Sequence, residues 1–217
     1  MTRLFNPAWA EARVDTHPYT WVYFAPGEFL TVAAEQELAH DFPMDGYQRR
    51  DRGARVTGKT YRNFSRPVAG PEGLADISDL APLWRRMIEA LLAPYYRVAM
   101  ARLLGQSVAG SIELRLVRHG GGDWLAPHVD GADKLFSHLI YFTADWEESW
   151  GGRLELLATA DPASAVRRIT PRLGVSISLT RTDQAWHSVT AVKGGRPERR
   201  SLLIHGLVDG AGAGGGS

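Results

Sequence analysis

Two histidines and one aspartate in the second half of the chain have the types and spacing of a metal site. His128 and Asp130 are separated by one residue, and His187 follows 57 positions after Asp130 (187 − 130). On a strand, residues i and i+2 project to the same face, so His128 and Asp130 project together and His187 comes from another strand. Two imidazoles and one carboxylate form the facial set that holds non-haem Fe(II) and leaves coordination positions open. We therefore predict that these three residues bind iron and are catalytic.

Other occupants of this residue set remain open at this point. Zinc competes for a site with two histidines and one aspartate. An isolated His-x-Asp pair is more often a surface pair or a hydrogen-bonded histidine of the core than a ligand pair. The surrounding sequence therefore decides how much weight the three residues carry.

Arg199, 12 positions after His187 (199 − 187), is a candidate for binding an anion beside the metal. The planar guanidinium grips a carboxylate with two hydrogen bonds and keeps its charge at any ordinary pH. Arg199 and Arg200 face opposite sides of a strand, and Ser201 shares the face of Arg199. A charge inside a barrel is costly without a partner, so Arg199 and Ser201 imply a bound anion. The alternative is two solvated arginines at a strand edge.

The sequence around these residues resembles the prolyl-4-hydroxylase-like branch of the Fe(II)/2-oxoglutarate oxygenases over residues 111–207. The segments that carry the resemblance occur in the family's order: LVRHGGGDWLAPHVD at 116–130, LIYF at 139–142, WGGRLEL at 150–156, WHSV at 186–189 and RRSL at 199–202. The resemblance implies a double-stranded β-helix with iron at one open end. It also implies Fe(II), 2-oxoglutarate and O2 as cofactor and co-substrates, with succinate and CO2 as co-products.

The chain departs from the family in two places. His119 stands where the family often has a tyrosine, and Arg199 lies further past His187 because of a longer turn at 193–197. The aspartate ligand is retained. Related halogenases have a small residue there so that chloride can bind iron, so Asp130 favours hydroxylation over halogenation.

Four further side chains are candidate site residues. His138 is expected to contact the co-substrate, and Arg118, His119 and Trp124 are expected near the substrate, because all four flank the motifs. For each histidine, a hydrogen-bonded structural role is the competing interpretation. For the tryptophan it is core packing, and for the arginine a solvated surface.

The pattern along the chain indicates an α+β protein that is mainly β, a jelly-roll or cupin-like core buttressed by N-terminal helices. Period-two alternation and Gly-rich turns predict strands at 111–118, 136–142, 153–157, 174–179, 185–192 and 199–207. Before them we expect a strand at 21–25, a helix within 28–40, an extended segment at 60–64 inside a polar loop, and a helix from Ser78 or Asp79 to Leu92. Pro94 either kinks that helix or begins a second one that ends before Gly105.

These elements are expected to form one oxygenase domain over residues 1–209. Within it, residues 1–110 supply helical support and lid elements, and residues 111–207 form the β-helix core. Residues 210–217, nearly all Gly, Ala and Ser, are expected to be a flexible tail.

Composition narrows the class of partner. The net charge of +1 over 217 residues gives no reason to expect nucleic acid as a partner. The chain has no cysteine, which excludes disulfides, zinc–thiolate sites and iron–sulfur clusters. No signal peptide or long apolar run is present, so we expect a cytoplasmic protein with no membrane partner.

The sequence therefore predicts a 2-oxoglutarate-dependent dioxygenase that hydroxylates an unactivated C–H bond of an amino acid or an amino-acid-derived small molecule. Peptidyl or prolyl hydroxylation is the alternative within the class. A non-catalytic cupin-like metal-binding module and a zinc hydrolase are the alternatives outside it, and neither explains Arg199.

Overall fold

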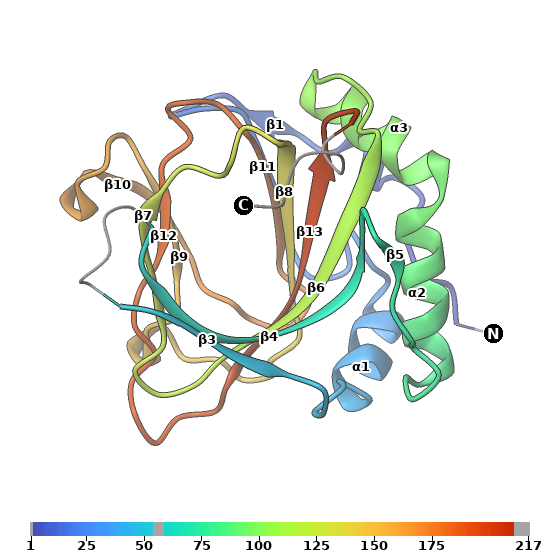
Figure 1. The fold of residues 1–217 in the computed structure, drawn as a ribbon, viewed down its shortest axis with the longest axis horizontal. Helices are drawn as coiled ribbons and strands as arrows, with labels where there is room; N and C mark the ends of the chain where they lie inside the picture. The colour runs from blue at the N-terminus through green and yellow to red at the C-terminus, as the bar shows by residue number, and fades with distance from the viewer. Residues whose placement is uncertain (1, 54–58, 211–217) are drawn as a thin grey trace.

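The core consists of two curled antiparallel sheets that face each other (Figure 1). The computed structural model describes residues 2–53 and 59–210. One sheet has the order β11 (Ser176–Thr180), β8 (Lys134–Tyr141), β13 (Arg199–Leu207), β6 (Ser111–His119). The other has the order β7 (Trp124–His128), β12 (His187–Val189), β9 (Leu154–Leu157), β10 (Ala165–Ile169). Except from β9 to β10, successive strands alternate between the sheets, which is the predicted double-stranded β-helix.

N-terminal strands extend this core on both sides. The strands β1 (Val14–Asp15) and β2 (Trp21–Phe24) continue the first sheet beyond β11. At its other edge, β4 (Tyr61–Gly70) pairs with both β6 and β7 and so joins the two sheets. The strands β3 (Gln48–Arg52) and β5 (Gly73–Leu74) pair with β4. Sequence analysis predicted only a short extended segment at 60–64, whereas β4 is a full strand of the barrel wall.

The helices cover the outer face of the first sheet, on the right of Figure 1. They are α1 (Val32–His40), α2 (Pro82–Leu92) and α3 (Pro94–Leu104), with short 3-10 turns at Trp9–Glu11, Glu148–Trp150 and Pro162–Ser164. The even-numbered residues of β6 and β13 pack against the helices in the main core: Leu114, Leu116, Leu202 and Ile204. Because side chains alternate along a strand, the odd-numbered residues of the same strands face the barrel interior.

The start of α2 differs from its predicted position. The helix begins at Pro82 with Ala81 as its cap residue, and not at Ser78 or Asp79. The Asp79 carboxylate is bound instead by Arg66, at 2.7 and 2.8 Å, and is therefore not available as a cap. Pro94 begins a separate helix, α3.

Two parts of the predicted organisation fall on residues outside the described ranges. The segment 54–58 belongs to the expected lid, and 211–217 makes up nearly all of the expected tail. Within the described ranges, no helix has the length and apolar character needed to span a membrane.

Candidate active site

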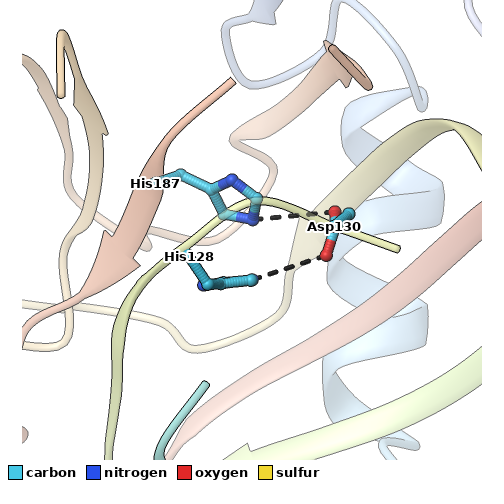
Figure 2. A group of neighbouring side chains, drawn as sticks. All are labelled: His128, Asp130 and His187. Atoms are coloured by element: carbon cyan, nitrogen blue, oxygen red, sulfur yellow. Dashed lines mark ion pairs between the residues drawn. The ribbon is translucent and has the colours of Figure 1, made fainter. Parts of the chain in front are cut away.

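His128, Asp130 and His187 converge at one end of the barrel (Figure 2). His128 ends β7 and lies directly opposite His187 on the neighbouring strand β12. The His128 Nε2 atom is 3.4 Å from Asp130 Oδ1, and the His187 Nε2 atom is 3.7 Å from Asp130 Oδ2. One ligand atom from each residue lies within 4.8 Å of the other two. The sequence prediction that these side chains project to one point is confirmed.

The hydrogen bonds of the two imidazoles fit a metal ion. His128 Nδ1 is 3.0 Å from the carbonyl of Ala126, and His187 Nδ1 is 2.9 Å from the carbonyl of Ala185. A carbonyl can only accept, so the hydrogen is on Nδ1 and each Nε2 presents a lone pair toward Asp130. His128 Nε2 is buried with no hydrogen-bond partner. Lone pairs that face a carboxylate repel it unless a cation lies between them, so this donor set fits a divalent metal.

Charge at the triad supports the same conclusion. Burial and the neighbouring His128 lower the pKa of His187 to about 4. Burial raises the pKa of Asp130, but the neighbouring His187 and His128 and the Lys59 ammonium outweigh burial and hold that pKa well below its ordinary value. The Ser137 hydroxyl donates to Asp130 Oδ2 at 2.6 Å, and Lys59 Nζ lies 3.6 Å from Oδ1. The carboxylate is therefore ionised and held in place from both sides.

Arg199 lies deep in the same barrel and is 1% exposed. Its Nη2 donates to the Tyr141 hydroxyl at 3.2 Å, and its Nη1 is 3.3 Å from His119 Nδ1. A guanidinium can only donate, so His119 Nδ1 accepts and the ring hydrogen is on Nε2. Burial, followed by the charge of Arg199, lowers the pKa of His119 well below its ordinary value, so the ring is neutral.

This deep end has donors that no protein group satisfies. His119 Nε2 and Arg199 Nε are both buried without a hydrogen-bond partner. Buried donors are normally paired, so an acceptor is missing at this place. Ser201 shares the face of Arg199, as predicted, and its hydroxyl lies 3.5 Å from the carbonyl of Val117. A carboxylate is the acceptor that suits a buried arginine with a neighbouring N–H donor.

One cavity of about 390 Å³ connects the triad with Arg199. Nine buried side-chain polar atoms of the described residues lack a partner, and six of them belong to residues that line this cavity. These six are Asn63 Oδ1, Ser65 Oγ, His119 Nε2, His128 Nε2, Arg199 Nε and His205 Nδ1. Such a concentration of unsatisfied groups marks the cavity as the ligand site of the described part of the chain.

Three predicted site residues lie elsewhere. Arg118 faces away from the barrel, binds Glu198 at 2.8 and 2.9 Å and lies over the ring of Tyr47. Trp124 packs under the guanidinium of Arg62, 4.8 Å from its ring centre, and is not among the residues that line the cavity. His119 does line it, at the deep end.

His138 is the third predicted site residue that lies outside the cavity, after Arg118 and Trp124. The expectation that it contacts the co-substrate is wrong. The side chain lies between the sheet and the helices, where its ring is in contact with Phe24 and Phe29. Its Nδ1 is 2.9 Å from the Tyr96 hydroxyl and its Nε2 is 3.2 Å from Ser176 Oγ. As an even-numbered residue of β8 it shares the face of Ile140, which packs in the helix-covered core. This is the structural alternative that sequence analysis left open.

The buried position of His138 predicts a pH dependence of stability. Burial lowers its pKa from 6.5 to about 3, so between these values the unfolded chain binds a proton that the folded chain excludes. The free energy of unfolding of the metal-free protein should therefore fall as pH decreases through this window. His138→Gln, which cannot titrate, should show a shallower decrease in denaturant melts across the same pH values. Parallel curves for the two proteins would contradict this assignment.

Several residues of the site were not predicted from the sequence. Tyr141 is part of a predicted apolar strand, Asn63 of the predicted extended segment at 60–64, and Ser65 of the polar loop around that segment. Glu113 and His205 were not singled out, although each lies in a strand with inward alternation. The alternation of β6 and β13 identifies which residues face inward, but only the pairing of the strands shows that they meet.

Comparison with known proteins agrees with this geometry. Residues 114–205 match the model of the 2OG-Fe(II) oxygenase superfamily. A prolyl-4-hydroxylase from Pseudomonas putida has a similar structure, with a TM-score of 0.67 at 18% identity over 93% of this chain and 100% of that chain. A Trichoplax adhaerens prolyl hydroxylase, solved with a peptide fragment of the hypoxia inducible factor oxygen degradation domain, gives 0.66 at 13% identity over 91% and 87%. No curated protein matches the chain.

The fold and the triad define an iron-dependent oxygenase of the double-stranded β-helix class. The core of the chain, residues 114–205, is that of a 2OG-Fe(II) oxygenase. The protein is thus an oxygenase, and the cofactor and co-substrates of this superfamily are Fe(II), 2-oxoglutarate and O2.

Proposed function

We propose that this oxygenase hydroxylates an unactivated C–H bond of an amino acid or an amino-acid-derived small molecule, with succinate and CO2 as co-products. The observation that supports it is the single cavity that holds a metal triad, an unsatisfied cationic end and charged side chains of both signs. A small zwitterion can satisfy such a cavity, whereas an apolar substrate would leave its charges unpaired.

The triad residues are assigned to the metal. His128 and His187 would each bind Fe(II) through Nε2, with the ring orientation fixed by the Nδ1–H bond to a backbone carbonyl. Asp130 would supply the third ligand, oriented by Ser137. When bound, Fe(II) with 2-oxoglutarate and O2 supplies the oxidising chemistry that breaks a C–H bond, and the protein supplies orientation and exclusion of water.

The deep end is assigned to the distal carboxylate of 2-oxoglutarate. Arg199 would bind it with charge-assisted hydrogen bonds, and His119 would add a second donor through Nε2–H. Arg199 Nε and His119 Nε2 are both buried without a hydrogen-bond partner, and a buried unpaired donor destabilises the folded protein. Binding of the carboxylate would satisfy both donors. The role of the Ser201 hydroxyl is to complete the polar wall beside them.

The cavity wall also contains apolar side chains. Leu139, Leu154, Val189 and Leu203 are among the residues that line it. These apolar side chains would keep water from the reacting C–H bond, while the polar groups of the cavity would fix the orientation of the ligands.

Peptidyl hydroxylation remains the second candidate. It is favoured by the structural similarity to prolyl hydroxylases, one of them solved with a peptide. Those similarities are below 20% identity and concern the fold. A metal-binding module without catalysis and a zinc hydrolase both leave the buried Arg199 and His119 donors without a ligand.

Substrate-stimulated succinate formation tests the proposed function. Purified protein with Fe(II), 2-oxoglutarate and O2 should form succinate faster when the correct amino acid is added, and the amino acid should gain the mass of one oxygen. A screen of single amino acids and short proline peptides separates the two candidates. Stimulation only by peptides would contradict the small-molecule proposal.

A further inference from the structure

A polar row crosses the first sheet at the depth of the metal triad. His205 on β13 pairs in register with Glu113 on β6 and with Ser137 on β8. All three residues line the cavity, and Ser137 leads directly to the metal ligand Asp130 through its 2.6 Å hydrogen bond. The row therefore forms the wall beside the metal site, at the opposite end of the barrel from Arg199.

Within this row, His205 has a ring nitrogen without a hydrogen-bond partner. The residue is 8% exposed, and its Nδ1 is buried with no hydrogen-bond partner. Burial lowers the pKa of His205 to about 4 despite the carboxylates of Asp130 and Glu113, which act in the other direction. The neutral ring has one donor and one acceptor, so Nδ1 can accept a hydrogen bond from a ligand.

Glu113 and Arg115 present an ion pair to the same cavity. They are separated by one residue on β6, so both side chains point inward, and Arg115 Nε donates to a Glu113 carboxylate oxygen. Glu113 is 14% exposed and Arg115 36%. An ion pair whose arginine is this exposed contributes little to stability, so its position in the cavity wall favours a role in recognition. Its two charges lie side by side, in the arrangement of a receptor for a neighbouring positive and negative group.

We propose that Glu113 and Arg115 recognise the α-ammonium and α-carboxylate groups of a free amino acid, and that His205 Nδ1 accepts a second hydrogen bond from the ammonium. This inference rests on the proposed function and adds that both α groups must be free. The ammonium contacts Glu113 and His205 beside the triad, and the carboxylate contacts Arg115. The amino-acid side chain is then directed at the metal site.

A residue within a peptide does not fit this arrangement. Its nitrogen and its carbonyl are uncharged, so the Glu113–Arg115 pair and the buried Nδ1 of His205 would lose solvent without gaining charged partners. Two other cations that line the cavity already have acidic neighbours: Lys59 is close to Asp130, and Lys134 binds Asp133 at 3.0 Å.

The test is a binding measurement under anaerobic conditions. Protein with Fe(II) and 2-oxoglutarate is titrated with each free standard amino acid, and then with the N-acetyl and the amide form of any amino acid that changes the visible absorption band. We expect at least one free amino acid to change the band and its two blocked forms to bind about ten- to a hundredfold more weakly, as for a lost charged hydrogen bond. The substitutions Glu113→Gln and Arg115→Met should each weaken binding of the free amino acid by a similar factor.

Matched controls separate this inference from the proposed function. Glu89→Gln changes an exposed glutamate on α2 and should bind the amino acid as the wild type does. The band given by 2-oxoglutarate alone reports that each variant is folded and holds its metal. No band in the wild type would contradict the oxygenase chemistry itself. A normal band with no response to any free amino acid, equal binding of the blocked forms, or unchanged binding by Glu113→Gln would overturn the inference.

Discussion

His187→Ala should abolish substrate-linked succinate formation and lower the affinity for Fe(II). The variant removes one of three ligands and leaves the buried lone pair of His128 and the Asp130 carboxylate facing a gap. Loss of an outer hydrogen-bond partner of a metal ligand already costs about 10–100-fold in affinity or activity, so loss of a ligand itself should cost more. Metal content after dialysis and 2-oxoglutarate consumption measure the two effects.

His40→Ala is the matched control for this variant. The His40 side chain is 88% exposed and lies on α1, outside the barrel. The His40→Ala variant should retain full metal content and turnover. Full turnover by His187→Ala would show that the metal assignment is wrong.

Arg199→Met should weaken 2-oxoglutarate binding while leaving Fe(II) binding intact. Methionine keeps much of the length of the side chain but removes its charge and donors. Truncating one partner of a buried charge pair costs about 2–5 kcal/mol, which corresponds to roughly thirtyfold to several thousandfold in affinity. A titration of the Fe(II) protein with 2-oxoglutarate gives the dissociation constant directly.

Arg200→Met provides the comparison that strand alternation suggests. Arg200 lies on the opposite face of β13, with its guanidinium carbon 5.7 Å from the ring centre of Phe42. The Arg200→Met variant should bind 2-oxoglutarate as the wild type does. If Arg200→Met loses affinity and Arg199→Met does not, the clamp has been assigned to the wrong arginine.

The fold of the second half could be predicted because its pattern is local. Period-two alternation and Gly-rich turns locate the strands of the core, and His128, Asp130 and Arg199 follow from side-chain alternation together with the family resemblance. The predicted length of β4 was too short because its inward side chains, Asn63 and Ser65, are polar and the segment therefore resembles a loop. Its strand character depends on pairing with β6 and β7, which are distant in sequence.

His138 shows where proximity in sequence misleads. It lies between Ser137 and Leu139, two residues that line the cavity, but alternation turns its side chain to the helix-covered face. Its sequence neighbours alone do not show which face of β8 is the inner one. The hydrogen bonds to Tyr96 and Ser176 settle this and also explain why a histidine is tolerated in the core. Conversely, Glu113 and His205 became site candidates only through the pairing of β6 with β13.

The central claim is that one cavity binds Fe(II) and 2-oxoglutarate together. Anaerobic addition of 2-oxoglutarate to the Fe(II) protein tests it most directly, since chelation of the metal by a 2-oxo acid gives a weak visible charge-transfer band. We predict that the band appears in the wild type with saturable dependence on 2-oxoglutarate, and that Arg199→Met requires much higher concentrations. Failure of the wild-type Fe(II) protein to develop the band at any 2-oxoglutarate concentration would contradict the account.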